Sequence, residues 1–296
     1  MSKSILNVGG YRIIGRIGTG ARTTIYEAVD LHTNRKIALK RAIYRQPQDR
    51  RIFEQVETEY KVATKIKHPY VRKCYKLKKI RSMLKVKEVI LTMELFNGES
   101  LEDGPALSLV DVLVVFRMVA SGLNAMHQHG FVHSDIKPNN ILMNKSGTIK
   151  IIDLGQSCKI GTVKPRIQGT PDYIAPEQVK RRPLGPKTDI FNLGATMYWA
   201  LTGHTIPTLI PKKDEFGRTI PQERRAPHEL RRKIPVGLSK LVMECVENNP
   251  QDRPDNMLTI ISRIDILVHS ILGDKFKTNK NGSINNRLAK QRDRSQ

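Results

Sequence analysis

The sequence predicts an α+β fold of two lobes, a small antiparallel sheet with one helix followed by a larger helical lobe. Its length of 296 residues corresponds to about two units of ~150 residues. Short runs of alternating or β-branched residues precede residue 97, and long patterns of helical periodicity follow it. We therefore expect an N-terminal lobe at 11–96, a C-terminal lobe at 97–273 and a basic, mobile tail at 274–296.

The N-terminal lobe should be built mainly of strands. Three runs separated by glycine and turn residues predict its first strands, at 11–17, 24–30 and 35–42. Residues 49–67 carry apolar side chains at helical spacing, so they should form a helix that packs one face on the sheet. Two further alternating runs predict the last strands of this lobe, at 71–80 and 84–93.

The C-terminal lobe should be built mainly of helices. Its apolar periodicity predicts four of them, at 109–128, 187–201, 236–248 and 255–272. The first contains the longest apolar stretch, but polar and charged side chains interrupt it before the ~20 residues that span a bilayer. We therefore expect a buried helix there and no transmembrane segment.

Compartment is indicated by the N-terminus and by the cysteines. The first residues show no long apolar signal core, and position 2 is not the glycine that myristoylation requires. Three cysteines, Cys74, Cys158 and Cys245, are far apart and odd in number, which argues against a disulfide framework. Both observations favour a cytoplasmic location. Cys158 is expected to be a small, half-buried filler rather than a reactive thiol.

The strongest anomaly of composition is positive charge. Lys and Arg number 51 against 28 Asp and Glu, a net charge of +23, and residues 71–87 contain many cations and no acid. Nucleic acid, an anionic surface such as acidic phospholipid, or an acidic protein would suit this charge. The ordinary interpretation is a solvated face, because no aromatic interleaving or nucleic-acid module accompanies the cations.

Two short stretches carry the chemistry. Residues 133–140 read His-Ser-Asp-Ile-Lys-Pro-Asn-Asn, and residues 153–155 read Asp-Leu-Gly. Together they resemble the catalytic loop and the metal-binding loop of eukaryotic-type (Hanks-type) serine/threonine protein kinases. The resemblance extends over about residues 11 to 270, and the residues of the motifs look like those of bacterial members of the family. It implies the bilobal protein-kinase fold.

The resemblance also implies roles for these residues. Asp135 would accept or orient the proton of the substrate hydroxyl, and Lys137 would stabilise charge on the γ-phosphoryl group of ATP. Asn140 and Asp153 would hold Mg²⁺ or Mn²⁺, which prefer such hard oxygen ligands. The nearby histidines could be taken for a separate metal site, but the family pattern makes them structural.

The expected ATP-binding residues begin with a glycine-rich turn between the first two strands. Small residues there let backbone amides approach phosphates, although Thr23 replaces the third glycine of the family. Lys40, in the run Ile-Ala-Leu-Lys, resembles the lysine that holds the α- and β-phosphates, and Glu59 its paired glutamate. The whole nucleotide set is Ile17, Gly18, Thr19, Gly20, Ile25, Ala38, Lys40, Met93, Glu94, Phe96 and Leu142. Met93 would lie at the back of the pocket, and the backbone of Glu94 and Phe96 would bind adenine.

Residues 169–177, Gly-Thr-Pro-Asp-Tyr-Ile-Ala-Pro-Glu, resemble the peptide-docking end of a kinase activation segment. Thr170 should hydrogen-bond with Asp135 and Lys137, as in serine/threonine kinases rather than tyrosine kinases. Two anchors complete the resemblance. Asp189 should brace the catalytic loop, and Arg253 should form a buried ion pair with Glu177.

The sequence departs from the family at the residues that usually bind an activating phosphate. Ser134 replaces the arginine between the histidine and aspartate of the catalytic loop, and Arg166 occupies the usual phosphate-bearing position. We therefore expect activity without activation-loop phosphorylation. A phosphate required at Thr162 or Ser157 would contradict this expectation.

The function predicted is a serine/threonine protein kinase that uses ATP and Mg²⁺ or Mn²⁺ on protein substrates, and acidic residues are expected around the target hydroxyl. One alternative is a catalytically weak pseudokinase, which should have lost at least one of the residues that bind phosphate, proton or metal. Lys40, Asp135, Asn140 and Asp153 are all present. The other alternative is a basic adaptor for an acidic partner, whose binding would depend steeply on salt.

Overall fold

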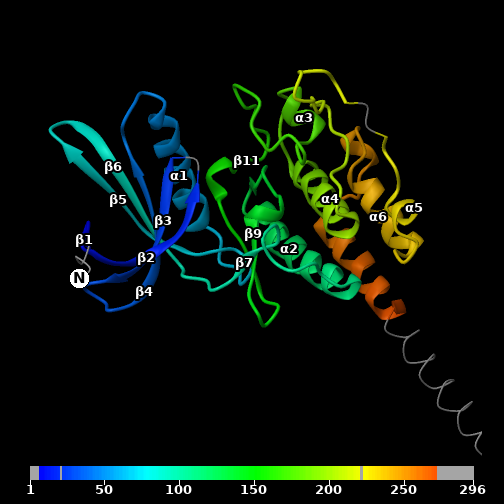
Figure 1. The fold of residues 1–296 in the computed structure, drawn as a ribbon, viewed down its shortest axis with the longest axis horizontal. Helices are drawn as coiled ribbons and strands as arrows, with labels where there is room; N and C mark the ends of the chain where they lie inside the picture. Colours follow the sequence, from blue (N-terminus) through cyan, green and yellow to red (C-terminus); the bar gives the residue numbers. More distant parts are fainter. Residues whose placement is uncertain (1–6, 21, 221–222, 272–296) are drawn as a thin grey trace, which may run out of the picture.

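The computed structural model describes residues 7–20, 22–220 and 223–271. Its ribbon has a strand lobe carrying one helix, α1 (Asp49–Ala63), and a helical lobe beside it (Figure 1). The two lobes confirm the α+β, bilobal fold. The basic tail expected at 274–296 lies outside the described residues.

The strand lobe is a six-stranded antiparallel sheet in the order β1-β2-β3-β4-β6-β5. Its strands are β1 (Asn7–Val8), β2 (Tyr11–Gly20), β3 (Thr23–Asp30), β4 (Lys36–Ile43), β5 (Cys74–Ser82) and β6 (Lys85–Met93). Side chains alternate between two cores, because successive residues of a strand point to opposite faces. On β4, Ala38 and Ala42 lie in the main core, whereas Ile37 and Leu39 pack in a smaller cluster on the other face.

Helix α1 (Asp49–Ala63) packs on the sheet through Phe53, Val56 and Val62. The first residue of the helix fixes the turn that precedes it. The Asp49 carboxylate accepts hydrogen bonds from the backbone N–H groups of Arg45 and Gln46 at 2.7 and 2.8 Å. The helix is shorter than expected. After Ala63 the chain turns, burying Ile66 before it reaches His68 and Pro69.

The helical lobe contains both long and very short elements. Its helices are α2 (Leu109–Gln128), α3 (Pro176–Val179), α4 (Pro186–Thr202), α5 (Pro227–Leu230), α6 (Val236–Cys245) and a final helix at 257–271. Its strands are β7 (Glu99–Ser100), β8 (Phe131–Val132), β9 (Ile141–Met143), β10 (Ile149–Ile151) and β11 (Cys158–Lys159). Single turns of 3-10 helix are η1 (Pro138–Asn140), η2 (Leu154–Gln156) and η3 (Pro250–Asp252).

Helix α2 is the core helix of this lobe. Its length and composition alone would let it cross a membrane, but half of its most apolar window is buried inside the fold. Phe116, Leu123 and Met126 are completely buried in the main core. Gly122 lets β10 come close, because a Cβ there would lie 2.7 Å from Cδ1 of Ile151. The helix expected at 109–128 is therefore present and is packed in the core, as the sequence predicted.

The lobes are joined through the segment that precedes β5. Val71 forms a parallel bridge with Ile151 of β10, and the Arg72 N–H donates to the Ile151 carbonyl at 3.0 Å. The expected strand 71–80 therefore begins only at Cys74, because its first residues pair with the other lobe. This pairing places the end of β10, and the Asp-Leu-Gly turn at 153–155 that follows it, next to the strand lobe.

Candidate active site

The catalytic loop between β8 and η1 is fixed by hydrogen bonds to a side chain of α4. The buried Asp189 carboxylate accepts the backbone N–H groups of His133 at 2.9 Å and Ser134 at 2.7 Å, and lies 2.8 Å from the His127 ring. Burial raises the pKa of Asp189, but the hydrogen bonds and charge of His127 and the Ser134 N–H outweigh it and lower that pKa. An ionised carboxylate thus fixes the loop, as the sequence predicted.

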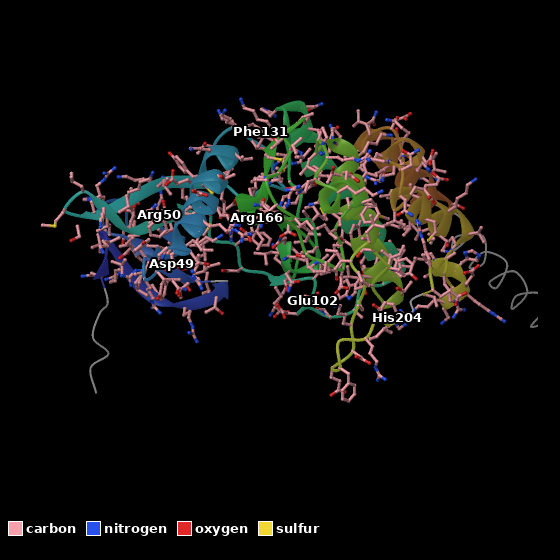
Figure 2. All side chains as sticks on the ribbon, turned by 90° about the horizontal axis from the view of Figure 1, so that it is seen from above. Asp49, Arg50, Glu102, Phe131, Arg166 and His204 are labelled. Carbon is pink, nitrogen blue, oxygen red and sulfur yellow. The ribbon has the colours of Figure 1, made fainter. Side chains whose placement is uncertain are left out.

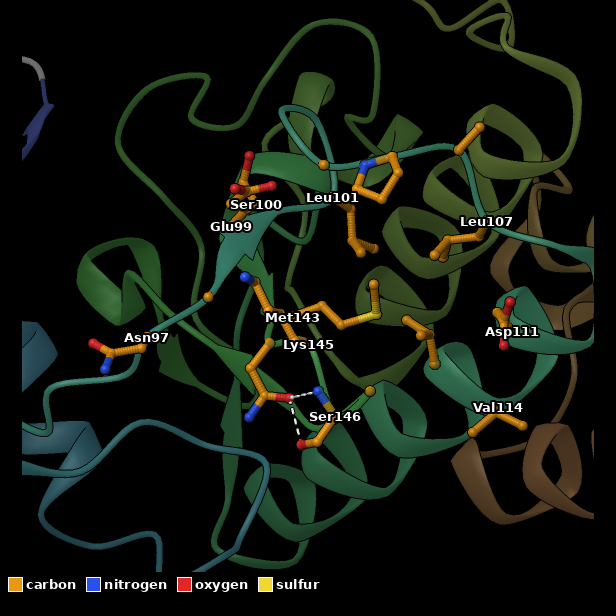
Figure 3. A pocket seen from close by; sticks show the side chains of 17 residues that line it. Asn97, Glu99, Ser100, Leu101, Leu107, Asp111, Val114, Met143, Lys145 and Ser146 are labelled. Atoms are coloured by element: carbon orange, nitrogen blue, oxygen red, sulfur yellow. Dashed lines mark hydrogen bonds between the residues drawn. The ribbon is translucent and has the colours of Figure 1, made fainter.

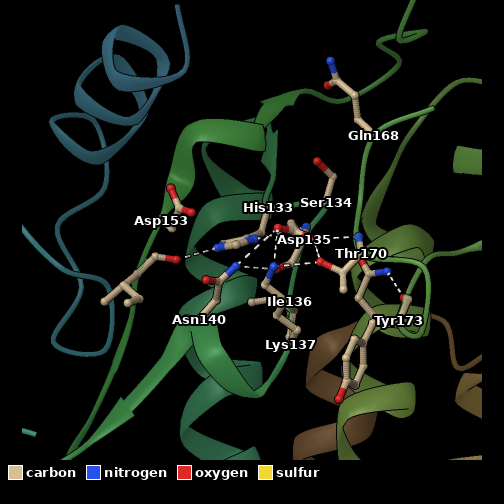
Figure 4. Close-up of polar contacts among 12 residues, drawn as sticks. His133, Ser134, Asp135, Ile136, Lys137, Asn140, Asp153, Gln168, Thr170 and Tyr173 are labelled. Atoms are coloured by element: carbon tan, nitrogen blue, oxygen red, sulfur yellow. Dashed lines mark hydrogen bonds and ion pairs between the residues drawn. The ribbon is translucent and has the colours of Figure 1, made fainter. Parts of the chain in front are cut away.

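Asp135 stands at the centre of a polar cluster that Figure 4 shows. Its Oδ1 accepts hydrogen bonds from the Thr170 N–H at 3.1 Å and the Thr170 hydroxyl at 3.0 Å. Lys137 donates to the Thr170 hydroxyl at 2.7 Å and lies 3.4 Å from Asp135 Oδ2. The structure therefore brings together the three residues whose meeting the sequence predicted.

Lys40 connects the two lobes. Its ammonium lies 2.7 Å from Oε2 of Glu59 on α1 and 3.1 Å from Oδ1 of Asp153. Burial lowers the pKa of Lys40, but the carboxylates of Asp153 and Glu59 outweigh it and raise that pKa above its usual value. In turn, the Lys40 ammonium lowers the pKa of Asp153 to about 2. The Lys40 ammonium and the Asp153 carboxylate are therefore both charged at neutral pH.

A second buried cation lies beside this pair. Arg72, which sequence analysis counted within a surface run of cations, is 6% exposed, and its guanidinium is 3.7 Å from Glu59 Oε1. Neither the Arg72 Nε nor the Glu59 Oε1 has a hydrogen-bond partner among the described residues. No sequence signal distinguishes Arg72 from its exposed neighbours, because its burial comes from the pairing with β10.

The expected ATP-binding residues of the sheet lie in two rows of neighbouring strands. Gly18 pairs with Ile25, and Ile25 pairs with Lys40 across β2, β3 and β4. Ala38 pairs with the fully buried Met93 across β4 and β6. Leu142 comes from the other lobe, on β9. Thr19 and Gly20 continue β2 at the turn, and Ile17 is half exposed on the same strand.

In the connection after β6, some backbone groups are hydrogen-bonded and others are left without a partner. The Glu94 N–H donates to the Lys73 carbonyl at 2.9 Å, and its carboxylate pairs with the buried Lys150 at 2.8 Å. The Phe96 carbonyl accepts the Gly98 N–H at 3.1 Å. Within the described part of the chain, the Glu94 carbonyl and the Phe96 N–H have no partner, so they are available to a planar base.

Oxygen donors for a metal come from two loops. The Asn140 amide nitrogen donates to the Asp135 carbonyl at 2.8 Å, which leaves its side-chain oxygen for another partner. The Asp153 carboxylate is 46% exposed beside Lys40. The histidines have other bonds: His127 to Asp189, His129 to the Ala125 carbonyl and His133 to the Ile152 carbonyl. Over the described residues, no three His, Cys, Asp or Glu side chains gather as a metal site.

The segment between η2 and α3 is fastened to the catalytic loop by side-chain to backbone hydrogen bonds. The Ser134 hydroxyl donates to the Gln156 carbonyl at 2.8 Å, and Lys164 donates to the same carbonyl. The Gln178 amide nitrogen donates to the carbonyls of Ser134 at 2.8 Å and Gln168 at 3.0 Å. No motif in the sequence points to these contacts of Gln178 and Lys164, because they depend on tertiary structure alone.

The Arg253–Glu177 ion pair and the half-buried Cys158 thiol are found as the sequence led us to expect. Arg253 forms a two-bond ion pair with Glu177 at 2.8 and 2.9 Å, with both side chains buried. Burial raises the pKa of the half-buried Cys158 thiol, which makes it a poor nucleophile.

A cavity of about 940 Å³ lies outside this cluster, below the connection after β6 (Figure 3). The chain around Leu101, Leu107 and Val114 lines it together with the turn after Met143. None of the residues expected to bind nucleotide, proton or metal borders it, so it is separate from the candidate site.

Comparison with known proteins gives a family match. The protein kinase domain model matches residues 11–263. A probable serine/threonine-protein kinase of Clostridium acetobutylicum is 25% identical over 277 residues, which cover 89% of this chain and 41% of that protein. PknL of Mycobacterium tuberculosis is 27% identical over 281 residues, 90% of this chain and 68% of PknL.

A third relative covers less of both chains. The serine/threonine-protein kinase PknA of Mycobacterium tuberculosis is 30% identical over 203 residues, which are 66% of this chain and 47% of PknA. The chain therefore matches less than half the length of two of these three relatives.

Proposed function

Because the chain belongs to the protein kinase family, we propose that it transfers the γ-phosphoryl group of ATP to serine or threonine hydroxyls of a protein substrate. The observation that carries this proposal is the cluster around Asp135. A carboxylate, an ammonium and a hydroxyl from two segments are held within hydrogen-bonding distance of one another. Phosphoryl transfer depends mainly on such positioning and on neutralisation of charge.

Each charged residue then has a task. Asp135, restrained by Thr170, orients and accepts the proton of the attacking hydroxyl. Lys137 lies beside it and balances negative charge on the phosphoryl group. Lys40, fixed by Glu59, holds the α- and β-phosphates from the strand lobe. These tasks explain why the cluster draws its charges from both lobes.

The residues present fit Mg²⁺. Asn140 and Asp153 offer one amide oxygen and one ionised carboxylate, the hard donors that Mg²⁺ and Mn²⁺ prefer over the nitrogen and sulfur of zinc sites. Mg²⁺ bound there would neutralise charge on the phosphates. Since the pKa of Asp153 is about 2, its carboxylate is ready for a cation at any pH near neutrality.

Transfer from ATP to a mixed peptide library tests the proposal. We expect phosphoserine or phosphothreonine and no phosphotyrosine, complete loss on chelation of divalent cations, and recovery with Mg²⁺ or Mn²⁺. The library also tests our proposal that acidic flanking residues are preferred, which rests on exposed cations such as Arg166, Arg181 and Arg182. Phosphotyrosine as the main product, or transfer that survives chelation, would contradict the assignment.

We further propose that this activity needs no phosphate on the activation segment. The phosphate-binding arginine is absent, and Ser134 and Gln178 fasten the segment instead through bonds to Gln156 and Gln168. The Ser157 side chain is buried at 4% exposure, which shields it from modification. These hydrogen bonds would hold the segment against the catalytic loop without a phosphate.

Protein treated with phosphatase, and a Thr162→Ala variant, should keep wild-type activity. By contrast, Gln178→Leu should lower kcat by roughly thirtyfold, because it removes two bonds worth ~1 kcal/mol each, one to the catalytic loop at Ser134 and one to the segment at Gln168. Mass spectrometry gives the phosphorylation state in each assay. Loss of activity on dephosphorylation, with the required phosphate at Thr162 or Ser157, would refute the proposal.

A further inference from the structure

The β5–β6 hairpin carries two unusual side chains at its tip. Met83 is 96% exposed and Leu84 is 90% exposed, more than any other large apolar side chain of the described residues. Register places Ser82 opposite Lys85, so these two residues alone form the turn. Single exposed apolar residues are common on soluble proteins, whereas these two are adjacent and lie together at a protruding turn.

The backbone of this turn is strained by its sequence. Met83 has φ of 53°, a left-handed conformation that glycine or asparagine adopts at least cost in two-residue hairpin turns. Methionine at this position gives up local stability and presents an apolar side chain to solvent. Such strain commonly marks a functional position.

A collar of cations surrounds the tip. We define this collar as Arg81, Lys85 and Lys87, all exposed and all within about 10 Å of the turn at ~3.4 Å per residue along the strands. Among the described residues, Arg81 and Lys85 have no ion-pair partner. Lys87 lies over the Tyr44 ring at 5.7 Å. Their charge therefore remains available to an external anion.

Two acids of the strand lobe, Glu88 and Glu57, already have cationic partners outside the collar. Glu88 on β6 is paired with Arg41 at 2.8 Å, and Glu57 on α1 is paired with Lys79 at 2.7 Å. The ribbon shows the hairpin projecting at the end of the strand lobe, away from the helical lobe (Figure 1), and the view from above shows the same projection (Figure 2). A large flat surface can thus approach the tip without covering the cluster around Asp135.

We propose that the β5–β6 hairpin docks this protein on an anionic lipid bilayer. Met83 and Leu84 enter the boundary between headgroups and acyl chains, and the collar contacts the lipid phosphates. An apolar tip with adjacent cations combines the two forces that hold peripheral proteins on membranes. Nucleic acid would match the collar, but it offers no apolar medium for the tip, and the tip has no aromatic ring for base stacking.

Vesicle co-sedimentation of the full chain tests this proposal, with phosphatidylcholine vesicles beside vesicles that also contain phosphatidylglycerol. Wild type should bind only the anionic vesicles. The tip variant, Met83→Ser with Leu84→Ser, should bind about tenfold more weakly, because two apolar side chains no longer leave water. The collar variant, Arg81→Gln with Lys85→Gln, should lose roughly fivefold per cation removed and show a weaker dependence on salt.

The matched control is Leu258→Ser with Ile266→Ser, which removes two exposed apolar side chains of the helical lobe, 56% and 67% exposed. It should bind as wild type does. Every variant keeps the basic tail, so differences between them report the hairpin. Phosphotransfer to a soluble peptide should be unchanged in the tip variant, which shows that the fold is intact and separates this proposal from the proposed activity.

Three results would overturn the proposal. The first is equal binding of wild type to anionic and neutral vesicles, and the second is binding of the tip and collar variants to anionic vesicles as tight as that of wild type. The third is tight binding of duplex DNA or single-stranded RNA that the hairpin variants lose while their vesicle binding stays unchanged. That result would assign the hairpin to nucleic acid instead.

Discussion

At the scale of single residues, the site depends on buried charges that compensate one another. Lys40 is held by two carboxylates, whereas Arg72 lies at 3.7 Å from Glu59 and leaves one nitrogen without a partner. The resemblance to protein kinases singled out Lys40, Glu59, Asp135 and Asp153, and the structure places Lys40 beside Glu59 and Asp153. Arg72 and Gln178 were not predicted, because their roles arise only from what the fold places beside them.

Lys40→Met should change how stability depends on pH. The pKa of Asp153 is lowered to about 2, below an unfolded value of ~3.9. Its ion pair therefore contributes stability fully at pH above the unfolded pKa, and this contribution is lost as pH falls towards 2. The stability difference between wild type and Lys40→Met should be larger at pH 6 than at pH 3 in urea unfolding.

The control for this prediction is Lys36→Met, which removes an exposed lysine paired with Glu27 at 2.9 Å. It should change stability little at either pH, because exposed ion pairs are weak. A difference between wild type and Lys40→Met that stays constant from pH 6 to pH 3 would show that Asp153 is not stabilised by this ammonium.

At the scale of elements, α4 and the short α3 hold the loops in place. The long, periodic helices and the alternating strands were predicted, with ends displaced where a tertiary partner intervenes, as at β5. The short strands β7 to β11 and the helices α3 and α5 were not predicted, because two to four residues show no measurable periodicity. Their hydrogen bonds to neighbouring segments define them, and those neighbours are distant in sequence.

Arg253→Met should destabilise the protein by roughly 3–5 kcal/mol, because it leaves the buried Glu177 charge, near the start of α3, without its partner. Urea unfolding measures the loss. Arg117→Met is the matched control. Its partner is Asp265, both side chains are about 40% exposed, and the expected cost is at most ~1 kcal/mol.

Arg72→Met, unlike Arg253→Met, should not lower the stability of the protein. Glu59 keeps its bond to Lys40, and an incompletely paired buried cation is replaced by an apolar side chain, so stability should be unchanged or higher. Equal losses in Arg253→Met and Arg117→Met, or a large loss in Arg72→Met, would contradict this ranking of buried ion pairs.

At the scale of the whole molecule, the order of a strand lobe and a helical lobe follows from where periodicity changes along the chain. The relation between the lobes does not follow from sequence, because it depends on the pairing of residues 70–72 with β10 and on the Lys40–Asp153 bond. Net charge left an acidic partner open, beside the ordinary interpretation of a solvated face. Only the structure concentrates part of that charge around two exposed apolar side chains.

Transfer of labelled γ-phosphate from Mg-ATP to the protein itself and to an acidic protein substrate tests the central claim most directly. It should be measured beside Asp135→Asn and Asp153→Asn, with nucleotide binding measured in parallel. We predict transfer to serine or threonine by wild type and a loss of at least ~100-fold in both variants. Nucleotide binding by wild type without transfer, or equal transfer by wild type and Asp135→Asn, would contradict the account.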